Sequence, residues 1–418
     1  MTARSSSLAR IALDAEPAAT AAPIVILGAG IGGLATALAL ARRGIASTVL
    51  EKRSVFEPEG AGIQIGPNGT RILEELGIAG RLEPLAGKPD EIHARSAISG
   101  QTLSRLPLGE WIATRHGAPY WVLHRSDLHH ALHEAAVAEP LITINMGFAA
   151  HAVSNASARN DDDTLIVEAA GGKTFASRAL VVADGLRSSL RDQVFDVPPL
   201  TFARKSAARA VITAEEMPAE LRENATAIWM SPSAHTVHYP VRAGREVALI
   251  FVRADAIASD DWSASVSAEW ITDCAREFAE PLRQLLATPR NWKKWALYEL
   301  PPMKRLSNAN ICLLGDAAHP TLPFMAQGGV LALEDAATLA SCVEQSPADL
   351  ARAFAIYDRE RLARTSSVVA QARRNGQIYH LDGFAARARD ATLRLTPPEI
   401  LMARYDWIYG WKARETAD

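Results

Sequence analysis

The sequence has few cysteines and no marked excess of charge of either sign. Its 418 residues include 3 cysteines, Cys274, Cys312 and Cys342, and no Cys-x-x-Cys pair. This scarcity excludes a disulfide framework or a zinc ribbon and is typical of a reducing compartment. A formal net charge of −3 at pH 7 gives no sign of nucleic acid or an anionic membrane as a partner. We therefore expect a cytoplasmic protein without a metal site that acts on a small molecule.

The segment from 17 to 41 lacks any charged residue, a property that it shares with transmembrane helices and signal sequences. Glycines gather in its middle, between positions 28 and 33. A strand, a glycine turn and a buried helix explain the same composition, so we expect no membrane span. Residues 1–22 show no apolar period and are expected to form a disordered tail.

The first periodic segments follow the pattern of a nucleotide-binding βαβ unit. An apolar strand over 24–27 precedes a helix over 32–43 and a second strand over 48–50. The first turn carries a Gly-x-Gly-x-x-Gly motif and an acid ends the second strand: Gly28, Gly30, Gly33 and Glu51. Such glycines let a pyrophosphate approach the helix N-terminus, and the acid can accept hydrogen bonds from an adenosine ribose. The unit predicts a bound dinucleotide without distinguishing FAD from NAD.

Past the middle of the chain, two alternating apolar runs flank a turn. The runs 235–241 and 247–252 predict a β-hairpin. The earlier pattern then returns with a strand over 311–314 and a helix over 330–343, and the chain from 348 onward is mostly helical. We therefore predict an α/β fold in which a sheet-rich section that covers a ligand is inserted into a nucleotide-binding unit.

A second motif follows the returning strand. The run Gly-Asp-Ala-Ala-His-Pro at 315–320 leads to Gln-Gly-Gly at 327–329, where the next helix begins. Together with the first motif, these runs resemble the flavoprotein aromatic hydroxylases, the family of para-hydroxybenzoate and salicylate hydroxylases. The resemblance implies that Asp316 holds ribityl hydroxyls of FAD and that the backbone at Gly328 and Gly329 faces flavin N1 and O2. A helix N-terminus there would stabilise the negative charge of reduced flavin.

Two more segments are similar to the same family. Asp184 begins the run Asp-Gly-Leu-Arg, which the resemblance places near the FAD pyrophosphate and connects with use of the nicotinamide cofactor. Arg125 corresponds to an arginine that reaches the flavin from the side, although a surface residue at a helix start is the other interpretation. The resemblance thus implies tight, noncovalent FAD. Because no second Gly-x-Gly-x-x-Gly motif precedes a strand-ending acid, NADH or NADPH is expected to bind only transiently.

The resemblance covers roughly residues 23–415 and implies a Rossmann-like FAD-binding domain, an inserted β-sheet substrate domain and a helical C-terminal segment. The expected division is a tail at 1–22, a discontinuous FAD-binding domain at 23–200 and 301–345, a substrate-covering sheet domain at 201–300 and helices at 346–418.

The implied reaction is hydroxylation of a small phenolic ring by O₂. In the family, reduced flavin and oxygen form a C4a-hydroperoxide, and a base with a near-neutral pKa removes the phenolic proton. His235, on the strand that faces the flavin, is the predicted base and Tyr239 a second catalytic residue; a structural histidine is the competing interpretation. The predicted pocket residues would shield the site from water: Trp229, Pro323, Phe324 and Met325.

Resemblances within the family point to different substrates. The runs at 119–129 and 379–411 look most like 3-hydroxybenzoate 6-hydroxylases, whereas Pro323 looks more like salicylate and 6-hydroxynicotinate hydroxylases. A hydroxybenzoate or salicylate is therefore the first expectation and a hydroxypyridine carboxylate the alternative. A flavin oxidoreductase without oxygen insertion and a noncatalytic FAD-bound interaction protein are further alternatives, and a homodimer is left open.

Overall fold

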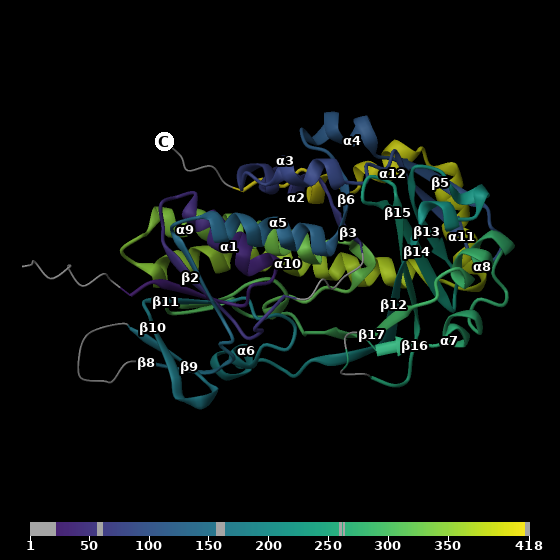
Figure 1. Ribbon diagram of the computed structural model, residues 1–418. Coiled ribbons are helices and arrows are strands. Elements are labelled where there is room, and N and C mark those ends of the chain that lie inside the picture. Colours follow the sequence, from purple (N-terminus) through teal and green to yellow (C-terminus); the bar gives the residue numbers. More distant parts are fainter. Residues whose placement is uncertain (1–21, 57–61, 156–163, 259–260, 262–263, 414–418) are drawn as a thin grey trace, which may run out of the picture.

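The structure, a computed structural model, describes residues 22–56, 62–155, 164–258, 261 and 264–413. The predicted tail therefore lies, except for Ala22, outside the described residues. Figure 1 shows two halves side by side, one built on a parallel sheet with helices and the other on a larger, mostly antiparallel sheet. The predicted α/β class is confirmed.

The first half is built on a six-stranded sheet with β1 of the predicted βαβ unit near its centre. The strand order is β18-β19-β11-β1-β2-β7, and all neighbours are parallel except β18 and β19. β1 and β11 are short and apolar, as expected where both faces of a parallel sheet are covered. The bounds are β1 Ile24–Leu27, β2 Ser47–Glu51, β7 Ile142–Met146, β11 Ala179–Val182, β18 Ser307–Asn308 and β19 Ile311–Leu313.

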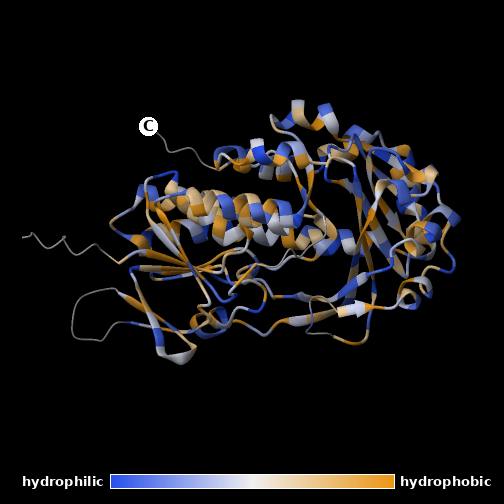
Figure 2. Cartoon of the chain, viewed as in Figure 1, coloured by the Kyte–Doolittle hydropathy of each residue, from blue (hydrophilic) through white to orange (hydrophobic). Residues whose placement is uncertain are grey.

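Three helices pack together on this sheet, α1 (Ile31–Ala41), α5 (Arg125–Ala138) and α9 (Gly328–Gln345). All of β1 and most of α1 are buried, and Figure 2 shows apolar residues concentrated in these elements. From residue 22 onward, the uncharged segment therefore divides into β1, the glycine turn and α1. Among the described residues, no helix is long and apolar enough to cross a membrane.

The second half is an eight-stranded sheet with the order β16-β17-β12-β15-β14-β13-β4-β5. The predicted hairpin is present as β14 and β15, and its turn places Arg242 and Ala243 at positive φ. The bounds are β4 Glu91–Ser96, β5 Thr102–Pro107, β12 Thr201–Thr213, β13 Ala225–Met230, β14 Ala234–Val241, β15 Glu246–Ala254, β16 Ala264–Val266 and β17 Trp292–Glu299.

This sheet does not follow the predicted domain boundary. β4 and β5 come from within 23–200, yet they extend the sheet because β13 pairs in parallel with β4. The assignment of the whole sheet to 201–300 is therefore wrong, since two strands from far earlier in the chain complete it. The rest of the predicted division stays a prediction.

Helix α10 (Leu350–Tyr379) packs against α9 and runs from one half of the molecule to the other (Figure 1). Helices α11 (Gly383–Leu395), α12 (Pro398–Ala403) and α13 (Asp406–Tyr409) follow it.

Two small sheets contain β3 Gly62–Ile65 with β6 Trp121–His124, and β8 Ala150–Asn155 with β9 Leu165–Ala169 and β10 Lys173–Ser177. The other α-helices are α2 Pro67–Glu75, α3 Ala79–Leu82, α4 Gly109–His116, α6 Ser189–Val194, α7 Ala268–Thr272 and α8 Glu280–Ala287. Short 3₁₀ helices include η5 Gly315–Ala317 and η6 Pro323–Met325.

Candidate active site

The turn between β1 and α1 has no room for a side chain at two of its motif positions. Gly28 has a φ of +95°, and a Cβ atom there would lie 2.5 Å from the carbonyl oxygen of Ala183. A Cβ atom at Gly33 would lie 1.9 Å from the carbonyl oxygen of Gly28. Gly30 differs, because a Cβ atom there would meet nothing within 4 Å. The space beside Gly30 belongs to an open cleft, where a ligand could approach the backbone.

Glu51 is buried and holds the same turn from the end of β2. Its Oε2 accepts a hydrogen bond from the amide of Ala29 at 2.8 Å, and its Oε1 accepts one from the amide of Arg53 at 2.9 Å. Helix α1 has no side-chain cap and no acid in its first turn, so its first N–H groups are available to an anion. Glu51 therefore shapes the anion site, and its predicted ribose contact stays a prediction.

The loop after β19 opens onto the same cleft. Asp316 lies at its start, and its side chain is exposed to the cleft even though protein surrounds the cleft. Desolvation by that protein raises the pKa of Asp316, while Arg125 and His319 oppose the shift. Gly328 and Gly329 begin α9, which also lacks a side-chain cap and an acid in its first turn. These predicted flavin residues and Arg125 therefore line one cleft.

Asp184 follows β11 and presents a buried acceptor. Its Oδ1 has no hydrogen-bond partner among the described residues, and burial raises the pKa of its carboxyl. Arg191 is buried nearby and donates to the carbonyl oxygens of Leu186 and Ala317, at 2.9 and 3.4 Å. Arg191 thus ties the loop of Asp184 to the loop of Asp316.

The cleft has a volume of about 340 Å³ and lies between the eight-stranded sheet and the two loops predicted to hold FAD, those after β1 and β19, hereafter the cofactor loops. This volume lies within the range of small-molecule sites. The wall formed by the loops, helix starts and β3 consists of Gly30, Ile31, Gly32, Gly62, Ile63, Gln64, Arg125, Ala183, Gly185, Leu314, Gly315, Asp316, Thr321, Pro323, Ala326, Gly328, Gly329 and Ala332. The sheet contributes Arg209, His235, Val237, Tyr239, Ile250, Val252 and Trp295.

Strand register arranges the sheet wall in rows. One row contains His235, Val252, Ala207 and Trp295, and the next contains Val237, Ile250 and Arg209. Rows two residues apart along a strand lie on the same face of the sheet. His235 and Arg209 therefore face the cleft from β14 and β12, with β15 between them.

His235 lines the cleft but is only 2% exposed. Its ring centroid lies 5.1 Å from that of Phe324 and 5.3 Å from that of Tyr379. Its Nδ1 lies 3.0 Å from Nε2 of His380. Burial, His380 and Lys205 hold the pKa of His235 well below its usual value, so the ring is neutral at pH 7. A neutral imidazole has one nitrogen lone pair with which to accept a proton.

Tyr239 connects the sheet to β3. Its hydroxyl donates to the carbonyl oxygen of Gly62 at 3.0 Å, and burial raises its pKa far above the neutral range. The phenol therefore stays protonated with its donor engaged, and only its oxygen lone pairs remain for a ligand. Its predicted catalytic role stays a prediction.

Trp229 does not line the cleft. It pairs with Thr236 on β14 and is fully buried on the opposite face of the sheet, with the Arg95 guanidinium 4.3 Å from its ring centroid. The predicted place of Trp229 in the substrate pocket is wrong, because alternation along β13 turns its side chain away from the cofactor loops.

The loop of η6 divides the other predicted pocket residues. Pro323 lines the cleft, whereas Phe324 lies behind it, against the ring of His235. Met325 is buried outside the cleft wall, and its Sδ lies 2.9 Å from Nδ2 of Asn375. The predicted place of Met325 in the pocket stays a prediction, because the single turn of η6 points successive side chains in different directions.

The sequence interpretation missed Arg209, Trp295, Gln64 and His380. Arg209 had a usable signal, since it is a charged residue within the small and apolar run Ala-Ala-Arg-Ala-Val of β12. Its guanidinium lies 5.4 Å from the Trp295 ring centroid. Gln64, Trp295 and His380 had no such signal, because only the pairing of distant elements brings them to the site.

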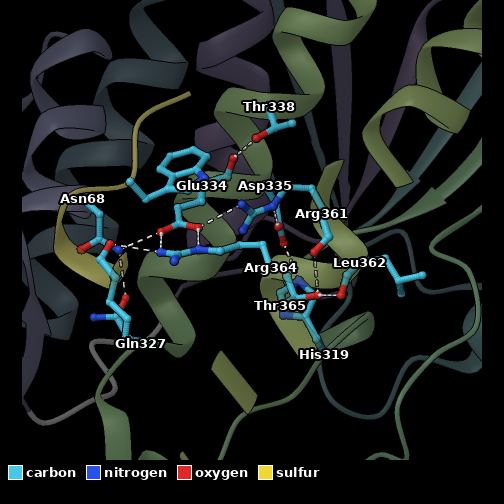
Figure 3. Close-up of polar contacts among 12 residues, drawn as sticks. Asn68, His319, Gln327, Glu334, Asp335, Thr338, Arg361, Leu362, Arg364 and Thr365 are labelled. Atoms are coloured by element: carbon cyan, nitrogen blue, oxygen red, sulfur yellow. Dashed lines mark hydrogen bonds and ion pairs between the residues drawn. The ribbon is translucent and has the colours of Figure 1, made fainter. Parts of the chain in front are cut away.

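A cluster of buried charges supports the cofactor loops from behind. Figure 3 shows Glu334 and Asp335 of α9 facing Arg361 and Arg364 of α10. Asp335 accepts hydrogen bonds from Arg361 Nε at 2.7 Å, from His319 Nε2 at 2.7 Å and from the amide of Gly315 at 3.0 Å. The last two bonds hold the loop that carries Asp316.

A second branch of the cluster reaches the start of α9. Arg364 donates to both carboxylate oxygens of Glu334, at 2.8 and 3.1 Å. Asn68 Nδ2 donates to Glu334 at 2.7 Å and to the side chain of Gln327 at 3.0 Å (Figure 3). Because Gln327 directly precedes Gly328, this branch fixes the end of α9 that faces the cleft.

The sequence profile of the FAD binding domain family matches residues 21–372. The 3-hydroxybenzoate 6-hydroxylase of Polaromonas naphthalenivorans is 35% identical over 391 residues, which cover 93% of this chain and 96% of that protein. The 6-hydroxynicotinate 3-monooxygenase of Bordetella bronchiseptica is 33% identical, over 82% of this chain and 89% of that protein. The structure of Klebsiella pneumoniae HpxO with FAD and uric acid has a TM-score of 0.80 at 24% identity, over 92% of this chain and 95% of that one.

Proposed function

Because the chain belongs to the FAD binding domain family of aromatic hydroxylases, we propose that it hydroxylates a monocyclic phenol that carries a carboxylate. The chain is an FAD-dependent monooxygenase, as predicted, and it uses O₂, an aromatic substrate and NADH or NADPH. One observation carries the substrate class: His235 and Arg209 face the cofactor loops from the same side of one sheet.

The described residues fit FAD. Side chains are excluded at Gly28 and Gly33, and the unpartnered Oδ1 of Asp184 offers a buried acceptor beside the cleft. We assign the pyrophosphate to the start of α1, the ribityl chain to Asp316, and the flavin edge to Gly328, Gly329 and Arg125. When bound, FAD supplies the reduction of O₂ from which one oxygen atom enters the ring.

The sheet holds the substrate in our proposal. Arg209 and His235 stand on strands two spacings apart and in neighbouring rows, so their backbones are separated by about 12 Å. Both side chains line the cleft, and in our proposal one ring lies against the sheet between them, over Val237 and Ile250. Arg209 pairs with the carboxylate, because a guanidinium matches a carboxylate in shape and charge.

His235 removes the phenolic proton in this arrangement, because a phenolate is more electron-rich than a phenol and reacts more readily with an electrophilic oxygen. The neutral ring accepts the proton on a nitrogen that faces the cleft. Pro323, Val252 and Ile250 cover the site with apolar surface and limit the access of water. Tyr239 orients the substrate through its hydroxyl oxygen.

A hydroxypyridine carboxylate is the second candidate. It carries the same two functional groups, an acidic hydroxyl and a carboxylate. The related Bordetella bronchiseptica protein is named for 6-hydroxynicotinate. Pro323 in the cleft wall favours it, since a proline at this position looks more like salicylate and 6-hydroxynicotinate hydroxylases. The hydroxybenzoate is preferred because the relative named for it shares more of its sequence with this chain.

The experiment is a titration of the purified holoenzyme with 3-hydroxybenzoate, salicylate and 6-hydroxynicotinate, followed by turnover with NADH or NADPH. The expected result is a perturbed flavin spectrum, substrate-stimulated oxidation of the nicotinamide and a product heavier by one oxygen atom for 3-hydroxybenzoate. Benzoate, which lacks the hydroxyl, is the matched control for binding without hydroxylation. Turnover of 6-hydroxynicotinate alone would select the second candidate, and turnover of none of the three would overturn the substrate class.

We further propose that the protein forms a homodimer through its C-terminal helices. Phe384 and Leu395 of α11 are 85% and 83% exposed and, about three turns apart, lie on the same side of the helix, where a second copy could cover both. Light scattering coupled to gel filtration tests the proposal, with Phe384→Ser expected to shift the population toward the monomer. A monomeric wild-type protein would contradict it.

A further inference from the structure

His235 has a second imidazole directly behind it. His380 caps the C-terminus of α10, and its Nε2 lies 3.0 Å from Nδ1 of His235, with ring centroids 5.0 Å apart. Phe324 and Tyr379 pack around the pair. His235 is buried, while His380 is only partly buried. The pair therefore extends from the cleft toward the outside of the protein.

A hydrogen bond between two neutral imidazoles fixes both tautomers. One nitrogen must donate and the other must accept, so the proton on each ring is determined by its partner. Nδ1 of His380 is buried without a hydrogen-bond partner among the described residues, while its Nε2 faces Nδ1 of His235.

The proposed function selects one of the two possible tautomer pairs, because Nε2 of His235 can take a proton only if it carries a lone pair. With the proton of His380 on Nδ1, its Nε2 carries the lone pair and accepts from Nδ1–H of His235. His235 then has no proton on Nε2, the nitrogen left for the cleft that the ring lines. The opposite pair would place a proton on Nε2 of His235 and remove its ability to act as a base.

We infer that His380 is a positioning residue that holds His235 in the base-competent tautomer. The inference rests on the proposed function, in which His235 removes a phenolic proton. In that step the O–H bond of the substrate breaks and an N–H bond forms at Nε2 of His235, while Nδ1–H of His235 stays hydrogen-bonded to Nε2 of His380. No bond other than N–H and O–H bonds changes.

The surroundings favour a hydrogen bond between two neutral rings. Burial, His380 and Lys205 lower the pKa of His235, and burial lowers the pKa of His380 to about 4, so both imidazoles are neutral at pH 7. In addition, Pro323 and Phe324 offer no side-chain hydrogen bond to His235, so the polar partner comes from α10 instead.

The first test measures the tautomer without any substrate. In holoenzyme labelled with ¹⁵N-histidine, the Nδ1 and Nε2 shifts of His235, assigned with His235→Gln, should show a proton on Nδ1 and none on Nε2. His380→Leu should allow the other tautomer to appear, whereas His380→Gln should keep the native one, because the amide oxygen can accept from Nδ1–H. A wild-type His235 protonated on Nε2 would overturn the inference.

The second test measures the chemical step with 3-hydroxybenzoate, in single turnovers that separate flavin reduction from product formation. His380→Leu should slow hydroxylation by about 10–100-fold, as is typical when the partner that orients a reactive imidazole is removed, and leave flavin reduction unchanged. His380→Gln should restore most of the rate, because its amide oxygen can accept from Nδ1–H of His235. His238→Leu is the matched control, because His238 lies on the opposite face of the same strand.

The outcomes separate the two proposals. Absence of hydroxylation by the wild type, with the expected tautomer present, would count against the substrate class while the positioning of His235 stands. Normal hydroxylation by His380→Leu, to within about threefold, would overturn the role of His380 while the proposed function stands.

Discussion

The two walls of the cleft are built in different ways. The wall to which we assign the cofactor consists of glycines, helix starts and loop backbone, and each part follows directly from a short motif. The wall to which we assign the substrate consists of side chains from β12, β14, β15 and β17, brought together only by strand register. The first wall is therefore specified locally and tolerates little change, whereas the second is specified by distant pairings and can vary its chemistry.

The difference allows the substrate wall to change while the cofactor wall is kept, and relatives of this chain are named for different substrates. A substitution on the sheet changes one row of the substrate wall and leaves the backbone of the cofactor wall in place. Variants of the two walls test whether they are separate in this sense.

The largest effect is expected for Gly33→Ala. A Cβ atom there would lie 1.9 Å from a backbone oxygen that cannot move independently, so the turn should rearrange and the protein should fail to retain FAD. Gly30→Ala is the more specific test of FAD binding, because its Cβ meets nothing in the protein itself. It should fold normally yet bind FAD about 10–100-fold more weakly, the effect of about 1–3 kcal/mol of crowding against the ligand.

Thermal unfolding of the apoprotein and FAD titration measure the two effects separately. Gly80→Ala is the control, since Gly80 lies outside the cleft and a Cβ there also meets nothing. Equal FAD affinity in Gly30→Ala and wild type would show that the pyrophosphate does not bind at this turn.

The next effect concerns the charges behind the cofactor wall. Asp335→Asn should destabilise the protein by about 3–5 kcal/mol, because it leaves Arg361 with an incomplete set of buried partners. It should also weaken FAD binding, since the amide of Gly315 loses a carboxylate acceptor. Glu344→Gln on the same helix removes only a partly exposed pair with Arg43 and should cost less than about 1 kcal/mol.

The same residue predicts a pH dependence. Burial alone would raise the pKa of Asp335, but His319, Arg361 and two hydrogen bonds reverse the shift and bring the pKa to about 2. A folded-state pKa below the unfolded value gives stability that is fully present above about pH 4 and is lost as the pH falls toward 2. Denaturant unfolding should show this loss, of roughly 2 kcal/mol, in the wild type and not in Asp335→Asn. Parallel pH profiles for the two proteins would contradict it.

On the substrate wall, Arg209→Met should raise KM for 3-hydroxybenzoate by about 10–100-fold, the loss of a charged hydrogen bond worth about 1.5–3 kcal/mol. FAD affinity should not change. Lys293→Met is the matched control, because Lys293 is the cross-strand neighbour of Arg209 on β17 but is exposed and does not line the cleft. Steady-state kinetics with a phenol that lacks the carboxylate should show no difference between Arg209→Met and wild type. An equal rise in KM for both substrates would show that Arg209 does not bind the carboxylate.

The same contrast sets how much the sequence could predict. Gly28, Gly33 and Glu51 were found because the turn, the helix and the terminal acid are neighbours in the chain, and the structure brings them together at one turn. Trp229 was misplaced because β13 had no predicted register, and one residue of slip reverses every side chain on a strand. His380 could not be found, since its partner lies 145 positions earlier in the chain.

The smallest effect should distinguish the two faces of the sheet. Trp295 and Trp229 each carry an arginine over the ring, at 5.4 and 4.3 Å, but Trp295 lines the cleft and Trp229 lies on the far face. Trp295→Phe should weaken 3-hydroxybenzoate binding about two- to fivefold, because a smaller ring holds Arg209 less firmly by about 0.5–1 kcal/mol. Trp229→Phe should leave binding unchanged and lower the free energy of unfolding by roughly 1–2 kcal/mol through the cavity that it creates. Flavin absorbance titration and denaturant unfolding of the two variants measure these quantities. If Trp229→Phe weakened binding as much as Trp295→Phe, both faces of the sheet would contribute to substrate affinity, and the substrate wall would extend beyond the side chains that line the cleft.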